Sequence, residues 1–133
     1  MIVGIGTDLV ACSRFVSVAI DPNDSLRTIF HEQEIAYCCQ EPALSAQRFA
    51  TRFAAKEAAY KALSSHAPEW HKPFRSVAKH IWVTHASTGA PQLAIDWHAL
   101  AYPQQTSALI CFVSLSHTPE YGTAIVVLQQ ATQ

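Results

Sequence analysis

Charged residues are scarce in this sequence. They make up 14% of its 133 residues, against roughly 25% in an ordinary globular domain. A chain with so few charges has difficulty covering its surface with polar groups, which indicates that part of the surface is buried between subunits. The net charge of −1 excludes a broadly basic surface that binds nucleic acids, so an anion site has to be a local patch.

The sequence also lacks long apolar runs and the pattern of a secretory signal. No apolar stretch approaches the roughly 18 residues that would cross a membrane, which excludes an integral membrane protein. The first residues contain no basic segment, and Asp8 interrupts the apolar stretch, which is not the pattern of a secretory signal. We therefore expect a cytoplasmic protein that binds neither membranes nor nucleic acids.

Cysteine and histidine occur, but not at the spacings of a metal site. Cys38 and Cys39 are adjacent, and the chain has no C-x-x-C or H-x-x-x-H sequence. This pattern disfavours zinc, and adjacent cysteines do not easily form a disulfide. Reduced, mostly buried thiols are expected, in agreement with a cytoplasmic location.

The length fits one domain, residues 1–133, with no room for a second of ordinary size. Residues 2–10 are rich in β-formers and predict a buried strand, whose glycines Gly4 and Gly6 would let another element approach closely. Residues 45–64 are rich in alanine and contain neither glycine nor proline, which predicts the longest helix. Further strands are predicted at residues 77–86, 92–97, 108–115 and 123–129. This order of elements predicts a single α+β domain.

The first predicted strand carries a carboxylate in an unusual position. Aspartate is disfavoured in strands and is costly to bury without a partner. Asp8 therefore needs a cation, backbone donors or a metal ion beside it. A second interpretation is that Asp8 caps the helix that follows the strand.

The long predicted helix carries two sets of charges. Arg48, Arg52 and Lys56 are spaced at i, i+4 and i+8, which places them on one face, where an anion such as phosphate would relieve their repulsion. Glu57 and Lys61 form an i, i+4 pair in the favoured order. The alternative interpretation of this pair is an ordinary surface salt bridge.

His117 closes the predicted strand at residues 108–115 and lies beside a predicted turn. It can donate a hydrogen bond to a phosphate, or it can cap the turn, and the sequence leaves both interpretations open. A catalytic pair with Ser116 is disfavoured because adjacent residues of a strand point to opposite faces.

Three of these sequences occur together in one known family. They are Ile-Gly-Thr-Asp-Leu at residues 5–9, Arg-Phe-Ala-Ala-Lys-Glu-Ala-Ala-Tyr-Lys at residues 52–61, and Ser-Leu-Ser-His-Thr at residues 114–118. In order and separation they resemble the motifs of the 4′-phosphopantetheinyl transferases, in particular the small class, the holo-acyl-carrier-protein synthases. The chain departs from the family at residues 64–66, where Ser-Ser-His replaces a frequent Gly-x-Gly, and at residues 89–91, where Gly-Ala-Pro replaces Gly-Lys-Pro.

The resemblance implies an antiparallel sheet packed on a long helix and a Mg²⁺-dependent transfer reaction. The phosphopantetheine arm of coenzyme A would move to a serine of an apo acyl carrier protein, or of a carrier domain in a fatty-acid or polyketide synthase, and 3′,5′-ADP would be released. Asp8 and Glu57 would hold the magnesium ion. Glu57, or a metal-bound water that it orients, would take the serine proton, and Lys61 would stabilise or protonate the leaving phosphate.

The resemblance also assigns the remaining candidates. His117 would donate to the coenzyme's phosphates, and Arg48, Arg52 and Lys56 would form a looser set for phosphate binding or subunit contacts. Arg14 would contact the acidic carrier protein. Small members of the family are trimers with active sites between subunits, which agrees with the low charge content. Two other hypotheses are a non-catalytic nucleotide-binding module on the same fold and a structural assembly protein.

Overall fold

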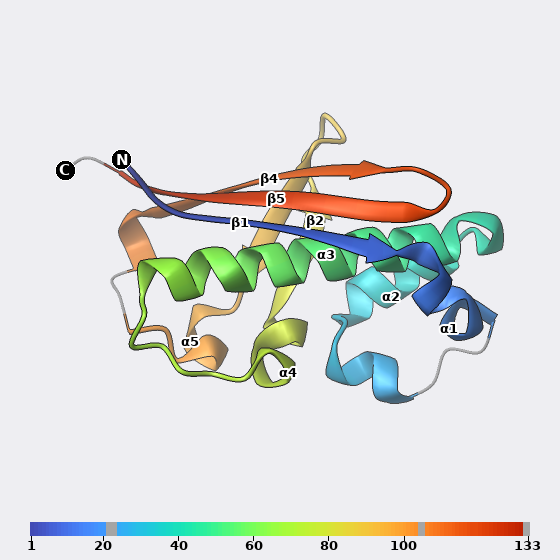
Figure 1. Ribbon diagram of the computed structural model, residues 1–133, viewed down its shortest axis with the longest axis horizontal. Helices are drawn as coiled ribbons and strands as arrows, with labels where there is room; N and C mark the ends of the chain where they lie inside the picture. The colour runs from blue at the N-terminus through green and yellow to red at the C-terminus, as the bar shows by residue number, and fades with distance from the viewer. Residues whose placement is uncertain (21–23, 104–105, 132–133) are drawn as a thin grey trace.

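The computed structural model describes residues 1–20, 24–103 and 106–131 (Figure 1). In chain order the elements are β1 (Ile2–Ala11), η1 (Cys12–Phe15), α1 (Val16–Ile20), η2 (Asp24–Thr28), α2 (Glu32–Cys39), α3 (Pro42–His66), α4 (Phe74–Val77), η3 (Ala78–His80), β2 (Ile81–His85), β3 (Pro91–Ile95), α5 (Trp97–Leu100), η4 (Thr106–Ala108), β4 (Leu109–His117) and β5 (Tyr121–Gln130).

The long helix α3 is the centre of the fold, as the alanine-rich sequence predicts. It begins with Pro42 in its first turn. Backbone N–H groups in the first turn have no acceptor within the helix, so a proline there costs no hydrogen bond. It continues for 25 residues because no glycine or proline interrupts it. It therefore extends beyond the predicted helix, residues 45–64, at both ends.

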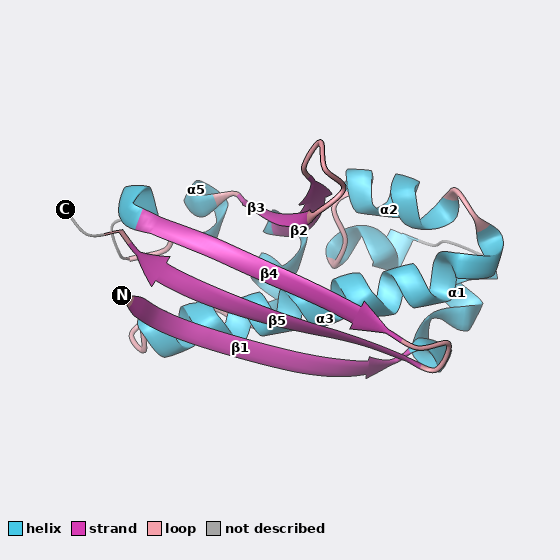
Figure 2. Cartoon of the chain, turned by 90° about the horizontal axis from the view of Figure 1, so that it is seen from above, coloured by secondary structure: helices cyan, strands magenta, loops and turns pink. Residues whose placement is uncertain are grey.

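A three-stranded antiparallel sheet in the order β1-β5-β4 packs on α3. The first and last strands of the chain are thus neighbours, and the described helices lie on one face of this sheet (Figure 2). The prediction of an α+β fold with an antiparallel sheet on a long helix is confirmed. The hairpin β2–β3 does not join this sheet but forms a separate two-stranded one. Residues 77–80, predicted as part of a strand, are helical instead.

Glycines bring β1 unusually close to α3. A Cβ atom at Gly6 would overlap the carbonyl oxygen of Ala58, and one at Gly4 would overlap that of Ala62. The helix presents alanines to the strand, and Ala58 and Ala62 are fully buried. The predicted close approach to this strand is confirmed, and it fixes the distance between the strand and the charged side chains of α3.

The other face of the sheet is apolar and exposed. Ile5 and Leu9 of β1, Phe112 of β4 and Ile125 of β5 are large hydrophobic residues between 41% and 65% exposed. No described helix covers this face (Figure 2). Among the described helices, none is long and apolar enough to cross a membrane.

Candidate active site

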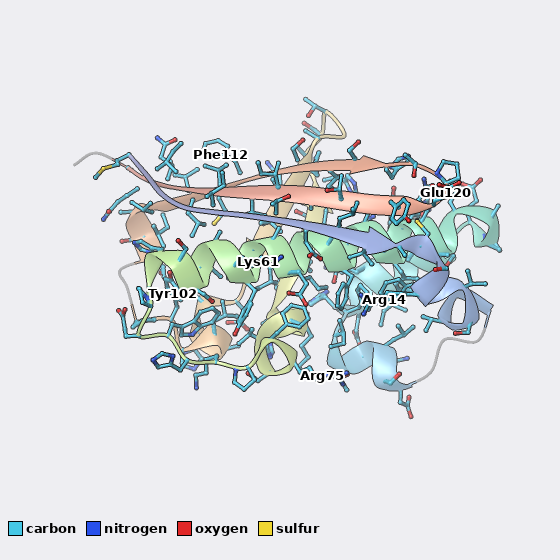
Figure 3. The ribbon with its side chains drawn as sticks, in the orientation of Figure 1. Arg14, Lys61, Arg75, Tyr102, Phe112 and Glu120 are labelled. Atoms are coloured by element: carbon cyan, nitrogen blue, oxygen red, sulfur yellow. The ribbon has the colours of Figure 1, made fainter. Side chains whose placement is uncertain are left out.

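Asp8 of β1 meets the charged side chains of α3 at the strand–helix contact. The Lys61 Nζ donates to the Asp8 Oδ1 at 3.2 Å and to the backbone oxygen of Thr7 at 2.9 Å. The Thr123 hydroxyl of β5 donates to the backbone oxygen of Asp8 at 2.8 Å. Figure 3 shows Lys61 on α3 beside β1. Asp8 therefore has a cation as its partner and does not cap the next helix, whose capping residue is Ala11.

Glu57 lies one helical turn before Lys61 and is half-buried. Burial raises the pKa of Glu57 above its usual value, and the negative charge of Asp8 raises it further. The positive charges of Lys61 and Arg14 act in the opposite direction. Among the described residues the ion pair of Lys61 is with Asp8, so Glu57 and Lys61 are not the ordinary surface salt bridge of the alternative interpretation.

Asp8 and Glu57 are the pair of carboxylates that could hold a divalent cation. Within the described ranges, no group of three His, Cys, Asp or Glu side chains could hold a metal ion. A cation bound by two carboxylates would complete its coordination with water and substrate oxygens, which is the usual arrangement for Mg²⁺. Burial first and the charge of Asp8 second raise the pKa of Glu57, and a cation between the two carboxylates would favour their charged forms.

A second group of predicted residues lines a pocket on the other side of α3. Its cavity of about 360 Å³ is bordered by Arg48, Arg52 and His117. His117 does not cap the nearby turn, because the Thr118 hydroxyl accepts the turn's backbone N–H groups instead. The turn-cap interpretation of His117 is therefore not supported, and its role toward a phosphate stays a prediction.

The two arginines of this pocket stack on one aromatic ring. The guanidinium of Arg48 lies 4.4 Å and that of Arg52 4.2 Å from the ring centroid of Tyr37. Arg48 also donates to the backbone oxygen of Tyr37 at 3.1 Å and lies 3.6 Å from the carboxylate of Glu41. Arg52 is 4% exposed, and its Nε has no hydrogen-bond partner.

Lys56 does not share this surface, which corrects the expectation that it binds phosphate or contacts a subunit. It is fully buried, forms an ion pair with Glu34 and donates to the backbone oxygens of Ala78 and Ile81. Eight residues of helix rotate a side chain by about 80°, which carries Lys56 away from Arg48 and into the core. Lys56 is a structural residue that joins α2, α3 and β2.

Two pocket residues, Tyr37 of α2 and His85 of β2, are not predicted as site residues from the sequence. Their rings lie 5.2 Å apart. Partial burial lowers the pKa of His85, and the positive charges of Arg52 and Arg48 lower it further. No motif marks either residue, because they reach the pocket from elements distant in sequence.

Arg14 follows β1 on the same side of α3 as Lys61 (Figure 3). Its guanidinium lies 4.9 Å from the ring centroid of Phe53, and its charge acts on Glu57. With Arg75 and Phe30 it borders a cavity of about 190 Å³. Arg14 therefore stands beside the carboxylate–lysine cluster, where a partner could reach it.

One chain does not bring its two groups of candidate residues together. Asp8 lies on β1 and His117 on β4, the two strands that flank β5. Asp8, Glu57 and Lys61 meet on one side of α3, whereas Arg48, Arg52 and His117 meet on the other. Each side of α3 thus carries half of the predicted site.

By its fold and site the chain is an α+β protein in which an antiparallel sheet packs on a long helix and a strand aspartate forms an ion pair with a helical lysine. The model of the 4′-phosphopantetheinyl transferase superfamily matches residues 4–126, and the chain belongs to this superfamily. The resemblance inferred from the three motifs is therefore confirmed.

Known proteins of this superfamily are similar along almost the whole chain. A holo-[acyl-carrier-protein] synthase of Geobacter sulfurreducens is 36% identical over 134 residues, which cover 98% of this chain and 99% of that protein. The solved acyl carrier protein synthase of Mycobacterium tuberculosis has a TM-score of 0.72 and 26% identity. The match covers 98% of this chain and 99% of that one. That of Bacillus anthracis, in complex with CoA (3′,5′-ADP), has a TM-score of 0.71 and 27% identity, with 99% of both chains covered.

Proposed function

We propose that this protein transfers the 4′-phosphopantetheine arm of coenzyme A to a serine of an apo acyl carrier protein and releases 3′,5′-ADP. The observation that carries the proposal is the cluster of Asp8, Glu57 and Lys61 at the β1–α3 contact. The full-length similarity to holo-[acyl-carrier-protein] synthases and the coenzyme in the Bacillus anthracis structure support the choice of substrates.

Asp8 and Glu57 are proposed to hold Mg²⁺. They offer hard oxygen ligands of the kind that magnesium prefers, with room in its coordination for water and phosphate oxygens. When bound, Mg²⁺ supplies electrostatic stabilisation of the negative charge on the pyrophosphate. Burial and, next, the charge of Asp8 raise the pKa of Glu57, and a bound cation would favour the charged forms of both carboxylates.

The chain's own residues then move the proton and stabilise the leaving group. The serine oxygen attacks the phosphorus nearer pantetheine, a new O–P bond forms, and the bond to the 3′,5′-ADP oxygen breaks. Glu57 takes the serine proton, and its raised pKa makes it a better base than an ordinary glutamate. Lys61 uses two of its three N–H donors on Asp8 and Thr7, so the third can contact the leaving phosphate.

Arg48, Arg52 and His117 are proposed to bind the coenzyme's phosphates in the pocket on the other side of α3. Two guanidiniums stacked on one aromatic ring are a rigid anion site, because their geometry is fixed before the ligand binds. Lys56 is not part of this set, since its ammonium is buried against Glu34.

We further propose that the protein is a homotrimer whose active sites lie between subunits. The two halves of the site lie on opposite sides of α3 in one chain, so the cluster of one copy would meet the pocket of the next. The exposed apolar face that contains Phe112 and Ile125 is the surface that such an assembly would bury.

Arg14 is proposed to contact the carrier protein, because carrier proteins are acidic and this guanidinium stands beside the cluster. The proposed substrate is an apo carrier, either a free acyl carrier protein or a carrier domain of a fatty-acid or polyketide synthase. With a free acyl carrier protein as the substrate, the proposed role is in fatty-acid synthesis, and the proposed location is the cytoplasm.

The test is mass spectrometry of an apo carrier protein after incubation with the protein, coenzyme A and Mg²⁺. We expect the carrier to gain about 340 Da, the mass of a phosphopantetheine group. The gain should disappear when the acceptor serine is replaced by alanine, and it should fall steeply with Asp8→Asn. An unchanged carrier mass together with tight coenzyme binding would instead favour the non-catalytic nucleotide-binding module.

A further inference from the structure

The residue that precedes α2 is a histidine used as a helix cap. The Nδ1 atom of His31 accepts the backbone N–H of Gln33 at 3.2 Å, and the backbone N–H of His31 donates to the Glu34 Oε1 at 3.1 Å. This reciprocal pair is a capping box, whose first residue is ordinarily serine or threonine. A hydroxyl oxygen accepts a hydrogen bond at every pH near neutrality, whereas an imidazole nitrogen accepts only while it carries no proton. The cap of α2 therefore depends on the protonation of one side chain.

The His31 ring is held in place by Trp82 of β2. The two rings are stacked, with their centroids 4.2 Å apart and their planes at 8°. The face of an indole ring attracts a cation, so the stacking persists when the imidazole is charged. In a charged imidazole both ring nitrogens carry hydrogen, and no rotation of the ring then offers an acceptor to Gln33. Protonation of His31 therefore removes the cap without removing the ring.

Charged groups from three other elements and from α2 itself surround the His31 ring, which borders a cavity of about 380 Å³. The basic groups are Arg27 of η2, Lys79 and His80 of η3, and Lys56 of α3. The acidic groups are Glu32 and Glu34 of α2 and Asp24 of η2. Each of these carboxylates already pairs with Arg27 or Lys56, so none is free to replace the lost cap by binding the charged ring. A proton on His31 also adds positive charge at the N-terminal end of α2, where the helix dipole is positive.

α2 carries two residues on which other elements depend. The Oε2 of Glu34 accepts the backbone N–H of Val83 at 3.2 Å, which ties α2 to β2. Tyr37, three residues later, presents the ring on which the guanidiniums of Arg48 and Arg52 stack. A loss of order in the first turn of α2 therefore reaches the support of both arginines within about one further turn.

We propose that His31 makes α2 sensitive to pH. When its ring is neutral, it fastens the first turn of the helix. When the ring gains a proton, in the range of about pH 5–8 where histidine changes its charge, the Gln33 N–H loses its acceptor and the turn loosens. Acidification then reduces the order of α2 and of the two arginines that Tyr37 supports. The inference concerns the free protein and depends on neither coenzyme nor carrier.

The test follows the ring and the cap in one pH titration of the full-length protein by NMR. At the alkaline end, the His31 Nδ1 should have the chemical shift of an unprotonated imidazole nitrogen, and both ring nitrogens should become protonated as the pH falls. Over that transition the protection of the Gln33 amide against hydrogen exchange, corrected for the intrinsic pH dependence of exchange, should fall about fivefold, the scale of one helix cap. In His31→Ser, which keeps an acceptor oxygen, the protection of Gln33 should stay constant over the same range.

The matched control is His80→Gln, which removes the other histidine that borders the same cavity. It should leave the pH dependence at Gln33 in place, because His80 does not cap α2. Thermal unfolding checks that both variants are folded. A serine is among the preferred residues at this position of a helix, so His31→Ser removes the titration without removing the cap.

A loss of Gln33 protection in the unaltered protein and in His80→Gln, but not in His31→Ser, supports the inference. It is overturned by an equal loss in His31→Ser, by constant protection while the His31 ring titrates, or by a proton on Nδ1 at the alkaline end. Disappearance of the pH dependence in both variants also overturns it, since His31 would then not be the switch by itself. No ligand is present in these measurements, so their result stands whether or not the protein transfers phosphopantetheine.

Discussion

Glu57 and Lys61 lie one helical turn apart on α3 but have different neighbours. Lys61 donates to Asp8 and to the backbone oxygen of Thr7 and is half exposed. Glu57 is half-buried, and its pKa is raised by burial and by the charge of Asp8. The two side chains can therefore contact different oxygens of one pyrophosphate, and their roles can be measured separately.

Lys61→Ala is expected to lower turnover by about 10²-fold or more, the usual scale for a positioned acid or charge stabiliser. It should change magnesium affinity little, because a cation is not a metal ligand. Glu57→Ala should lower both the turnover and the magnesium affinity. The measurement is titration of Mg²⁺ in the presence of coenzyme A. If Lys61→Ala abolishes magnesium binding and Glu57→Ala preserves it, the assigned roles are wrong.

The pH dependence of turnover reports the charge around Glu57. A base acts only when it is deprotonated, so the raised pKa of Glu57 places the acid limb of the profile above that of an ordinary glutamate. The charge of Arg14 lowers this pKa. In Arg14→Gln the pKa should rise, and the acid limb of kcat at saturating carrier should move to higher pH. Arg27 lies beside the carboxylates of Asp24 and Glu32, so Arg27→Gln should leave the limb in place. A shift to lower pH for Arg14→Gln would contradict the assignment.

At the scale of elements, the glycines of β1 decide how near Asp8 comes to α3. Gly6→Ala would place a methyl group against the carbonyl oxygen of Ala58. We expect a loss of about 1–3 kcal/mol in the free energy of unfolding from overpacking. Activity should also fall, because the strand and Asp8 are displaced from Lys61. Urea unfolding and the carrier assay measure the two effects.

Gly89→Ala adds the same methyl group at a position with open space around it. Its backbone φ of +86° costs about 1–2 kcal/mol for a residue with a Cβ atom. Gly89→Ala therefore lowers stability without moving Asp8, and it serves as the control for Gly6→Ala. Full activity of Gly6→Ala at a temperature where it is folded would refute the role of the close strand–helix contact.

The buried pair of Lys56 and Glu34 joins three elements. Glu34 accepts from the backbone N–H of His31 and of Val83, and Lys56 donates to the backbone oxygen of Ala78 at 3.0 Å. Desolvation lowers the pKa of Lys56, and the charge of Glu34 opposes this effect. The pair thus holds α2 and β2 against α3, and with them the walls of the pocket that Arg48, Arg52 and His117 border.

Lys56→Met should destabilise the protein by about 3–5 kcal/mol near neutral pH, because it leaves the Glu34 carboxylate buried without a counter-charge. Its stability should rise as the pH falls, since an unpaired buried carboxyl has a raised pKa and folds best when protonated. The double variant Lys56→Met/Glu34→Gln should recover part of the loss at neutral pH. Equal stability of the single and double variants in chemical unfolding would refute this account.

At the scale of the molecule, the bare apolar face and the divided site point to the same assembly. Light scattering at micromolar concentration should give about three times the chain mass of 14.6 kDa. Phe112→Asp places a charge on the exposed face and should produce a folded monomer. This monomer should be inactive, because the carboxylate–lysine cluster of one copy would no longer meet the pocket of the next. His98→Asp, on an exposed position of α5, should leave the trimer intact. A fully active monomer would contradict the shared site.

Complementation tests the division of the site directly. Asp8→Asn removes the carboxylate cluster, and His117→Ala alters the pocket. When the two inactive chains are refolded together, about a quarter of the shared sites in a random trimer combine two intact halves. Activity should therefore return in the mixture and not in either variant alone. No recovery in mixed trimers would place both halves in one chain.

The sequence by itself determined the long helix, the strand with two glycines and the residues of the carboxylate–lysine cluster. Composition and local periodicity are sufficient for these features, because α3 has no helix breaker and Gly4 and Gly6 lack the side chains that would block the approach of Ala62 and Ala58. The three motifs identified the superfamily for the same reason, since each lies within a short continuous segment.

Only the tertiary structure decided what the basic residues of α3 do. Arg48, Arg52 and Lys56 have the same spacing in sequence, yet two line the pocket and the third is buried on Glu34. Helical periodicity gives the direction of a side chain, but not which neighbouring element covers it. His85 likewise enters the pocket because the β2–β3 hairpin packs there, and that packing depends on contacts between residues far apart in the chain.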